Sequence, residues 1–245
     1  MRLDLALVQR GLTPTRARAR DAIRRGAVRV GGHAVTKAGA EVAADAPLAL
    51  DDPASGYVSR AALKLIAGLD AFGIEVGGRR ALDIGASTGG FTQVLLERGA
   101  AHVIALDVGH GQLAPALRND ARVTVIEGRN ARDLSAAHLP HPPDLIVADV
   151  SFISLTLALP PALALAAPDA RCVLLVKPQF EVGREGVGKG GLVAAELAEA
   201  TAERLRTWLD RLPGWRARRL VPSPIEGGDG NREWLLGGVK DLVDA

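Results

Sequence analysis

Alternation between short apolar runs and helix-forming segments is the feature that most restricts the possible folds of this chain. It begins near Ser59 and continues to the C-terminal end. The expected strands are 80–84, 102–107, 123–127, 145–149, 172–177, 216–221 and 234–238, and the expected helices are 89–98, 111–118, 155–166 and 194–212. Because a helix after each strand returns the chain to the same edge of a sheet, this order predicts an α/β fold. We expect a Rossmann-like, doubly wound sheet of seven mostly parallel strands.

The N-terminal region differs from the rest in its charge. Residues 1–37 carry nine Lys and Arg against two Asp, a net charge of +7, whereas the whole chain has +2, so residues 38–245 sum to −5. A strongly basic end indicates a polyanionic partner. We therefore expect a small α+β module over 1–52, a linker over 53–58 and the larger α/β domain over 59–245.

A basic stripe is expected on a helix of this module. Thr13 can cap free amide groups, Pro14 suits a first helical turn, and Gly26 ends the helix. The arginines that recur every four residues on one face are Arg16, Arg20 and Arg24. Such a stripe is typical of a polyanion-binding surface, although an isolated basic helix face can also be merely solvated.

A small sheet is expected after this helix. Two short alternating runs, 28–30 and 33–35, flank Gly31-Gly32, which is a typical two-residue hairpin signal. A third run, 47–50, can close the sheet.

The loop after the first strand of the larger domain reads Asp83-Ile84-Gly85-Ala86-Ser87-Thr88-Gly89-Gly90-Phe91. Nucleotide-like ligands bind at this turn in open α/β sheets, because glycines let the ligand approach the backbone at a helix N-terminus. A dinucleotide site requires G-x-G-x-x-G, but Ser87 replaces the second glycine. The loop also matches the G-x-S-x-G elbow of α/β hydrolases, although no histidine follows His141 to complete a triad. A hydrolase using Ser87 is therefore an alternative.

We favour S-adenosylmethionine binding for this loop. Asp107 ends the next strand, 24 residues after Asp83, where an acid can bind the ribose hydroxyls of the ligand. Asn130, just beyond the third strand, is placed to meet the adenine, unless it is a plain turn asparagine. The candidate cofactor-binding residues are Asp83, Gly85, Ser87, Gly89, Phe91, Asp107, Asn130 and Asp149.

Lys177 and Asp149 end neighbouring strands and are expected at the same edge of the sheet. A lysine has an ordinary pKa of roughly 10.4, which desolvation and a second cation can lower toward about 7 to 8, whereas arginine stays charged. The chain has only five lysines against 25 arginines, so a lysine at this edge indicates that a proton must be accepted there. A structural salt bridge between the two residues is the alternative.

Other features exclude several classes of protein. Residues 183–189 match the phosphate-binding pattern G-x-x-x-x-G-K, but Gly190 stands where Ser or Thr must ligate magnesium, so we expect a glycine-rich flap beside the active site. The uncharged stretch 150–167 is interrupted by Pro160-Pro161, so no membrane span is expected. Residues 1–20 lack the apolar core of a signal peptide, which predicts a cytoplasmic protein.

Cysteine use also limits the chemistry. Cys172 is the single cysteine, so neither an intramolecular disulfide nor a cysteine zinc cluster can form, and no metal is expected. Methylation of cytosine C5 needs a nucleophilic cysteine, and Cys172 begins a buried strand. Adenine N-methylation is disfavoured because Asp149-Val150-Ser151-Phe152 lacks paired prolines.

The N-terminal module resembles a known RNA-binding module, the αL motif of small-subunit ribosomal protein four. The matching residues are Arg2-Leu3-Asp4, Leu7-Val8, Gly11-Leu12, Thr15-Arg16, Ile23, Gly26, 28–32, Val35 and Lys37. This resemblance implies RNA binding, mainly by phosphate contact and shape. The candidate RNA-binding residues are Arg2, Arg16, Arg20, Arg24 and Lys37.

Motifs along nearly the whole chain resemble the TlyA, or hemolysin A, family. They are Tyr57-Val58-Ser59-Arg60, Leu63-Lys64-Leu65, 83–92, 149–154, 177–181, 188–191, Ser223-Pro224-Ile225 and Gly230-Asn231-Arg232-Glu233. Ala61-Ala62 departs from the family's usual pair of glycines, which leaves open how closely the backbone beside Lys64 approaches a ligand.

The resemblance implies an S-adenosylmethionine-dependent methyltransferase that modifies the 2′-oxygen of a ribose in ribosomal RNA, as FtsJ-type enzymes do. It further implies cytidine as the target, ribosomal RNA or a ribosomal subunit as the partner, and a catalytic tetrad. We also expect a monomer. The tetrad falls on Lys64, Asp149, Lys177 and Glu233. A non-catalytic ribosome-binding factor with a vestigial cofactor site is the alternative from another class.

Overall fold

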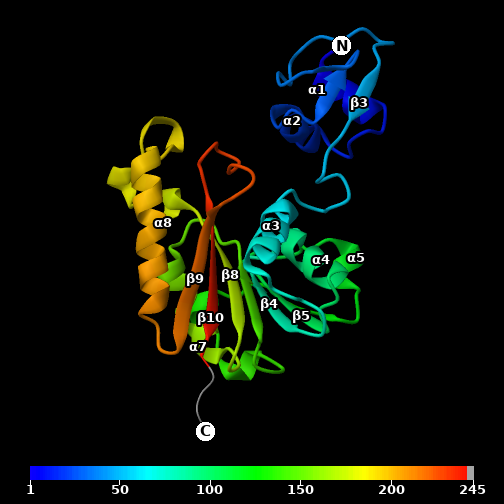
Figure 1. Cartoon of the computed structure of the whole chain (residues 1–245). Helices are drawn as coiled ribbons and strands as arrows, with labels where there is room; N and C mark the ends of the chain where they lie inside the picture. The colour runs from blue at the N-terminus through cyan, green and yellow to red at the C-terminus, as the bar shows by residue number, and fades with distance from the viewer. Residues whose placement is uncertain (242–245) are drawn as a thin grey trace. The chain divides into compact units, whose positions relative to one another are not determined.

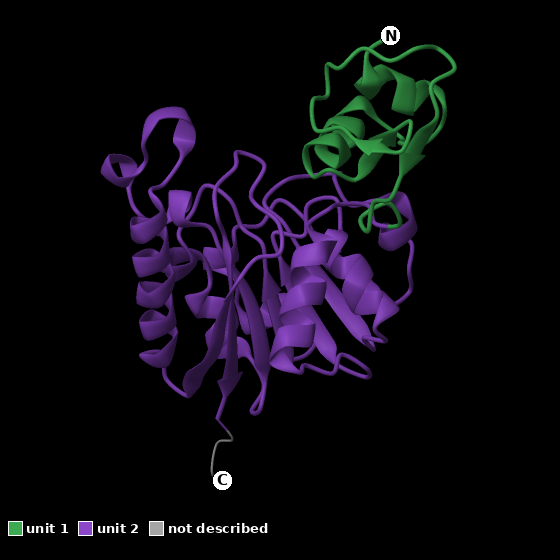
Figure 2. Cartoon of the chain, turned by 45° about the horizontal axis from the view of Figure 1, so that its top comes forward, with its two compact units in different colours: residues 1–56 green, residues 57–245 purple. Residues whose placement is uncertain are grey.

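The protein divides into two compact units, residues 1–56 and the chain from residue 57 onward, which Figure 2 draws in green and purple. The structure is a computed structural model and describes residues 1–241. Each unit has a hydrophobic core of its own.

The first unit packs two helices on a small antiparallel sheet. Its elements are α1 (Leu3–Gln9), α2 (Arg16–Arg24), β1 (Val28–Val30), β2 (His33–Ala34) and β3 (Leu48–Leu50), with strand order β2-β1-β3. The expected hairpin forms between β1 and β2, since Gly31 and Gly32 both adopt the positive φ that a tight turn requires. Leu3 and Leu7 of α1 meet Ile23 of α2 in a fully buried cluster.

The helix boundaries in this unit differ from the expectation. Thr15, not Thr13, caps α2, because its side chain accepts a hydrogen bond from the Arg18 amide at 3.2 Å. The Thr13 amide still bonds back to the Leu7 carbonyl and belongs to the end of α1, a helix that was not expected.

The second unit contains the expected α/β sheet. Its strands are β4 (Arg80–Ile84), β5 (His102–Leu106), β6 (Val123–Ile126), β7 (Leu145–Ala148), β8 (Arg171–Val176), β9 (Trp215–Pro222) and β10 (Trp234–Lys240). The strand order is β6-β5-β4-β7-β8-β10-β9. Strands β4 to β8 are parallel, whereas β10 pairs antiparallel with both β8 and β9. The prediction of a mostly parallel sheet is therefore confirmed (Figure 1).

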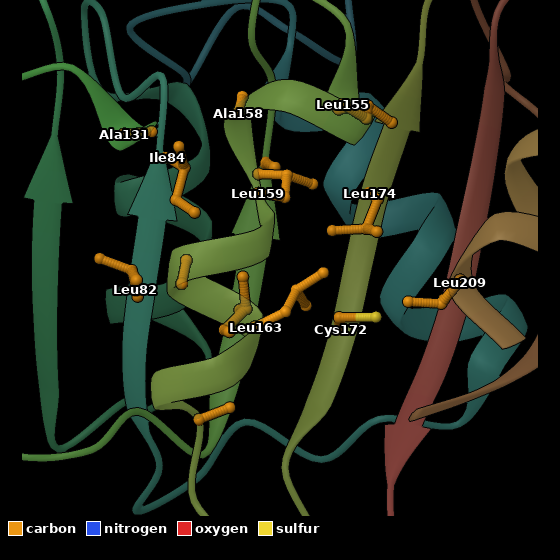
Figure 3. Close-up of a cluster of buried hydrophobic side chains, with 14 of the residues drawn as sticks. Leu82, Ile84, Ala131, Leu155, Ala158, Leu159, Leu163, Cys172, Leu174 and Leu209 are labelled. Carbon is orange, nitrogen blue, oxygen red and sulfur yellow. The ribbon is translucent and has the colours of Figure 1, made fainter. Parts of the chain in front are cut away.

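Helices cover both faces of this sheet. They are α3 (Ala62–Phe72), α4 (Gly90–Glu97), α5 (Pro115–Arg118), α6 (Leu155–Ala158), α7 (Pro160–Leu165) and α8 (Ala195–Asp210), with short 3-10 turns at Ala131–Asp133, Ala136–His138, Pro178–Phe180, Arg184–Gly186 and Lys189–Gly191. One core joins α6, α7 and α8 to the sheet, where Leu163 and Leu209 lie among buried strand residues such as Leu174 (Figure 3). The other core joins α3 and α4 to the opposite face.

Three helical segments differ from the expectation. The helix expected over 155–166 is two short helices, because Pro160 starts a new helix at its first position. The helix expected over 111–118 begins only at Pro115, because Ala114, the residue before this proline, has an extended ψ of 137°. Helix α3 was not expected at all.

No helix within residues 1–241 is both long and apolar enough to cross a membrane.

The sheet direction brings distant segments to one edge. The carboxyl ends of the parallel strands β4 to β8 lie at this edge, so the loops that follow them meet there. Because β10 is antiparallel, its first residue, Trp234, lies opposite Val176 at the end of β8. The residue before β10, Glu233, is thereby brought beside the ends of β7 and β8.

Candidate active site

The loop between β4 and α4 is shaped by residues with positive φ. Gly85 has φ 82°, and a Cβ atom there would lie 2.6 Å from the Asp149 carbonyl oxygen, so only glycine fits. Gly89 has φ 101°, and a Cβ atom there would collide with Leu117 and Leu113. Ser87 also has a positive φ, 48°. The conformation of the loop therefore depends on glycine at positions 85 and 89.

Two adjoining hollows open beside this loop. The larger has a volume of about 890 Å³, and the smaller about 150 Å³. Of the candidate residues, Gly85, Ser87, Asp107, Asn130 and Asp149 line the larger hollow. Gly85, Ser87, Phe91, Asp149 and Lys177 line the smaller one, with Ala61. Because Gly85, Ser87 and Asp149 line both, the two hollows adjoin each other at the loop.

Asp107, which follows β5, accepts a hydrogen bond from the glycine loop. Its two carboxylate oxygens accept hydrogen bonds from the Ser87 amide at 2.8 Å and from the Gly109 amide at 2.7 Å. The carboxylate retains free lone pairs on the side of the larger hollow, where they can accept from ligand hydroxyls.

Asp83 lies behind the loop rather than in either hollow. It is fully buried, and its Oδ2 accepts a hydrogen bond from the Thr92 hydroxyl at 2.7 Å, whereas Oδ1 has no hydrogen-bond partner among residues 1–241. Burial raises the pKa of Asp83 to about 7, opposed by the hydrogen bond from Thr92 and assisted by the charge of Asp149.

The Ser87 hydroxyl has no catalytic base beside it. It donates to the Gln112 side-chain oxygen at 3.2 Å, and within residues 1–241 no histidine is bonded to it. The positive φ of Ser87 matches a nucleophile elbow, but this partner argues against a hydrolase.

Lys177 and Asp149 meet directly at the ends of β8 and β7. The Lys177 ammonium forms an ion pair with Asp149 Oδ1 at 2.6 Å and donates a hydrogen bond to the Ser151 hydroxyl at 2.8 Å. Ser151 lines both hollows. Sequence reasoning did not single out Ser151, although it stands two residues after Asp149.

Lys64 and Glu233 form a second pair, which lies outside both hollows. The Lys64 ammonium is hydrogen-bonded to Glu233 Oε2, and the side chains are only 7% and 2% exposed. Burial raises the pKa of Glu233, while the charges of Lys64 and Lys177 oppose that shift. The four candidate catalytic residues thus form one cluster of two cations and two acids.

Asn231 was not predicted from the sequence as a site residue. It is buried, and its side chain accepts from the Val193 amide at 2.9 Å and donates to the Gly191 carbonyl at 2.8 Å. It therefore joins the glycine-rich segment 183–191 to the loop that carries Glu233. Its place two residues before Glu233 was the available signal.

The loop after β7 also contacts the turn after β8. Glu181 accepts hydrogen bonds from the Leu155 amide at 2.7 Å and the Ser154 hydroxyl at 2.6 Å. Phe152, with φ 64° and 90% exposed, lies against Phe180 with ring centroids 5.0 Å apart. An exposed aromatic ring at the rim of the larger hollow can stack on a base.

Cys172 is fully buried in β8, and burial raises the pKa of its thiol. It is therefore unsuited to act as a nucleophile. Among residues 1–241 no group of three or more His, Cys, Asp or Glu side chains is arranged to hold a metal ion.

The first unit holds a different charge cluster. The carboxylate of buried Asp4 accepts from Arg2 at 3.1 and 3.2 Å, from Arg16 at 2.8 Å and from Arg20 at 2.9 Å. Arg24 and Lys37 are exposed and lie outside this cluster. The structure thus brings together three of the five candidate RNA-binding residues.

Comparison with known proteins agrees with the division of the chain into two compact units. Residues 1–46 match the S4 domain, and residues 57–240 match the FtsJ-like methyltransferase family. The chain is 47% identical over 241 residues to the 16S/23S rRNA (cytidine-2′-O)-methyltransferase TlyA of Mycobacterium tuberculosis (strain ATCC 25618 / H37Rv), covering 96% of this chain and 88% of that protein. It is 40% identical over 238 residues to Hemolysin A of Brachyspira hyodysenteriae, covering 96% and 98%.

A solved structure shares both the sequence pattern and the fold. The structure titled "Putative hemolysin from Streptococcus thermophilus" matches with a TM-score of 0.76 and 38% identity, covering 98% of this chain and 88% of that one. These similarities and the family match to most of the chain confirm the resemblance noted in the sequence. The chain belongs to the TlyA family of FtsJ-like methyltransferases.

Proposed function

We propose that the chain transfers a methyl group from S-adenosylmethionine to the ribose 2′-oxygen of a cytidine in ribosomal RNA. The observation that carries the proposal is the cluster of two lysines and two acids beside the hollow of the glycine loop. The names of the TlyA relatives support ribosomal RNA and cytidine as the substrate. Such a substrate would place the enzyme with the ribosomes, in the cytoplasm.

The residues of the larger hollow fit S-adenosylmethionine. This ligand carries positive charge on its sulfur and amino group, and the hollow has Asp107 and Asp149 in its walls, with the unpartnered Oδ1 of Asp83 behind it. Gly85, in the wall of this hollow, lets the loop pack against the Asp149 backbone, where a Cβ atom would clash. Asp107 would hold the ribose hydroxyls and Asn130 the adenine. When bound, the cofactor supplies an electrophilic methyl group.

Lys177 is the proton acceptor in this proposal. Its nitrogen lies in the smaller hollow, where Asp149 and Ser151 fix its position from two sides. Lys177 would first release its ammonium proton to solvent. A 2′-hydroxyl bound there would then give its proton to the neutral amine as the oxygen becomes nucleophilic. Alignment of that oxygen by the walls of the hollow would supply much of the remaining rate.

Lys64 and Glu233 would support Lys177 and Asp149 electrostatically, without lining either hollow. Glu233 holds the buried Lys64 ammonium, which adds positive charge near Lys177 and favours oxyanion character in the hollow. All four charged positions are occupied and paired, which argues against a vestigial site in a non-catalytic ribosome-binding factor.

The remaining features suit an RNA substrate. The S4 domain carries exposed arginines that can contact phosphates, while Phe152 offers a ring on which the target base can stack. Binding energy and chemistry would then come from separate units of the chain.

The proposal is tested by mapping the methyl group. The purified protein is incubated with tritiated S-adenosylmethionine and isolated ribosomal subunits or free ribosomal RNA, and the labelled nucleosides are identified. We expect 2′-O-methylcytidine. Label on a base would contradict ribose methylation, and the absence of label from every RNA would favour the non-catalytic factor.

The cofactor assignment has its own test. Asp107→Ala removes charge-assisted hydrogen bonds worth roughly 1.5 to 3 kcal/mol, so S-adenosylmethionine should bind about 10- to 100-fold more weakly in isothermal titration. NAD should not bind to the unmodified protein. Tight NAD binding without a response to S-adenosylmethionine would overturn the assignment.

A further inference from the structure

Asp4 is an acid at the centre of a basic surface, which is an unexpected position in a module that binds a polyanion. It is fully buried in the first turn of α1, and its carboxylate contacts Arg2 at 3.1 Å, Arg16 at 2.8 Å and Arg20 at 2.9 Å. The three guanidinium groups lower the pKa of Asp4, so it remains charged throughout the physiological range. The cluster therefore has a fixed net charge of +2.

The geometry leaves the terminal nitrogens of Arg16 and Arg20 free, whereas Arg2 uses Nε and one terminal nitrogen to reach Asp4. Arg16 and Arg20 both use Nε to reach Asp4. Within residues 1–241, their terminal nitrogens have no further acceptor, and the Arg2, Arg16 and Arg20 side chains are 42% to 45% exposed. Terminal guanidinium nitrogens are the donors that bind phosphate oxygens in pairs.

We propose that Asp4 is a positioning residue that holds Arg2, Arg16 and Arg20 as a preformed phosphate clamp. This inference rests on the RNA-binding role proposed for the first unit. A free arginine loses considerable side-chain entropy when it is fixed by a ligand. Three arginines already tethered by a buried carboxylate have lost much of it before RNA arrives. Asp4 therefore strengthens RNA binding although its own charge repels RNA.

The charge of Asp4 makes the inference sharply testable. Asp4→Asn preserves the size of the side chain and removes one negative charge, so the net charge of the unit rises by one. If only net charge decides affinity, the variant should bind RNA more tightly. If the tether decides it, the variant should bind about tenfold more weakly. Asp45→Asn makes the same charge change at an exposed residue of the same unit and serves as the matched control.

The measurement is fluorescence anisotropy of a short labelled RNA hairpin with the full-length chain, at several salt concentrations. We expect Asp4→Asn to bind more weakly than the unmodified protein, and Asp45→Asn to bind equally or slightly more tightly. Equal or tighter binding by Asp4→Asn would overturn the inference. If the unmodified protein binds neither the hairpin nor isolated ribosomal subunits, the proposed RNA-binding role fails, and the inference fails with it.

A second pair of variants decides the case if Asp4→Asn does not fold. Arg16→Met and Arg24→Met each remove one positive charge from the same face of α2, but only Arg16 is tethered to Asp4. The clamp predicts that Arg16→Met loses several-fold more RNA affinity than Arg24→Met. Equal losses would show that the helix acts through its summed charge, and would overturn the role of Asp4.

Discussion

The two units of this chain hold charge clusters that differ in their cations and in their exposure to solvent. In the first unit, one buried acid holds three arginines whose side chains remain 42% to 45% exposed. In the second, Lys64 and Lys177 each pair with one acid, and all four side chains are largely buried. Arginine keeps its charge and offers several donors to phosphate, whereas a desolvated lysine can exchange a proton. This difference fits the proposal that the first cluster binds RNA and the second performs the chemistry.

The largest expected effect comes from erasing this difference at Lys177. Lys177→Arg keeps a cation beside Asp149 but cannot release a proton at working pH. We expect turnover on RNA to fall by about 10² to 10⁴, the usual contribution of a general base. S-adenosylmethionine binding, measured by titration calorimetry, should persist as evidence of a folded site. A loss of less than about threefold would show that the pair is only a structural salt bridge.

The second prediction compares the loss of one cation from the buried cluster with the loss of one cation from an exposed ion pair of the same unit. Lys64→Met leaves Glu233 buried without its own partner, which should lower the free energy of unfolding by about 3 kcal/mol. Urea unfolding followed by tryptophan fluorescence reports on the second unit, because Trp208, Trp215 and Trp234 all lie there. Arg206→Met breaks the exposed pair with Glu203 in the same unit and should cost less than about 1 kcal/mol. Equal losses would contradict the difference drawn between buried and exposed pairs.

A third, smaller effect should appear only in the first unit. In a triple variant, Arg16, Arg20 and Arg24 are each replaced by Met, which removes three candidate phosphate contacts. The slope of log affinity against log salt should fall by roughly 0.7 to 0.9 per lost contact. Calorimetry should show unchanged S-adenosylmethionine binding. An unchanged slope would identify the stripe as a solvated helix face.

The smallest effect compares two buried acids, Asp4 and Asp83, whose pKa values shift in opposite directions. Burial raises the pKa of Asp83 to about 7. Between about pH 4 and pH 7, the Asp83 side chain therefore holds a proton in the folded chain but has lost it in the unfolded chain. Stability therefore falls as the pH rises through this window. Asp83→Asn should remove the fall. Relative to the unmodified protein, the stability of the variant should therefore be about 2 to 3 kcal/mol higher at pH 8 than at pH 5, since each of the two pH units between pH 5 and the pKa contributes about 1.36 kcal/mol.

Urea unfolding at the two pH values measures this difference, followed by circular dichroism because the tryptophans report only on the second unit. Asp4→Asn supplies the contrast, because the pKa of Asp4 is lowered and its stabilisation is lost only in acid, as the pH falls below the ordinary range of a carboxyl group. A pH-independent effect of Asp83→Asn would contradict the assignment of a neutral buried acid.

The sheet and its binding edge were predictable because local patterns determine them. The strands carrying Asp83, Asp107 and Asp149 end within one residue of their expected positions. Parallel strands then bring those ends together without further information. The same reasoning placed Lys177 beside Asp149.

Three features depend on pairing that no local pattern reveals. Lys64 lies on α3, an unexpected helix, and Glu233 reaches it only because β10 is antiparallel. From the sequence, these two residues entered through family resemblance alone. The tether of Arg2, Arg16 and Arg20 to Asp4 likewise follows from the packing of α1 on α2, whereas the sequence showed only a stripe.

Single-turnover methylation at increasing RNA concentration tests the division of labour most directly. The rate at saturating RNA reports the chemical step, and the RNA concentration at half-maximal rate reports binding. We predict that Lys177→Arg lowers the saturating rate at least 100-fold and leaves the half-maximal concentration nearly unchanged. The triple replacement of Arg16, Arg20 and Arg24 should do the reverse. If both variants lower the same quantity, the two clusters do not have separate roles and the account is wrong.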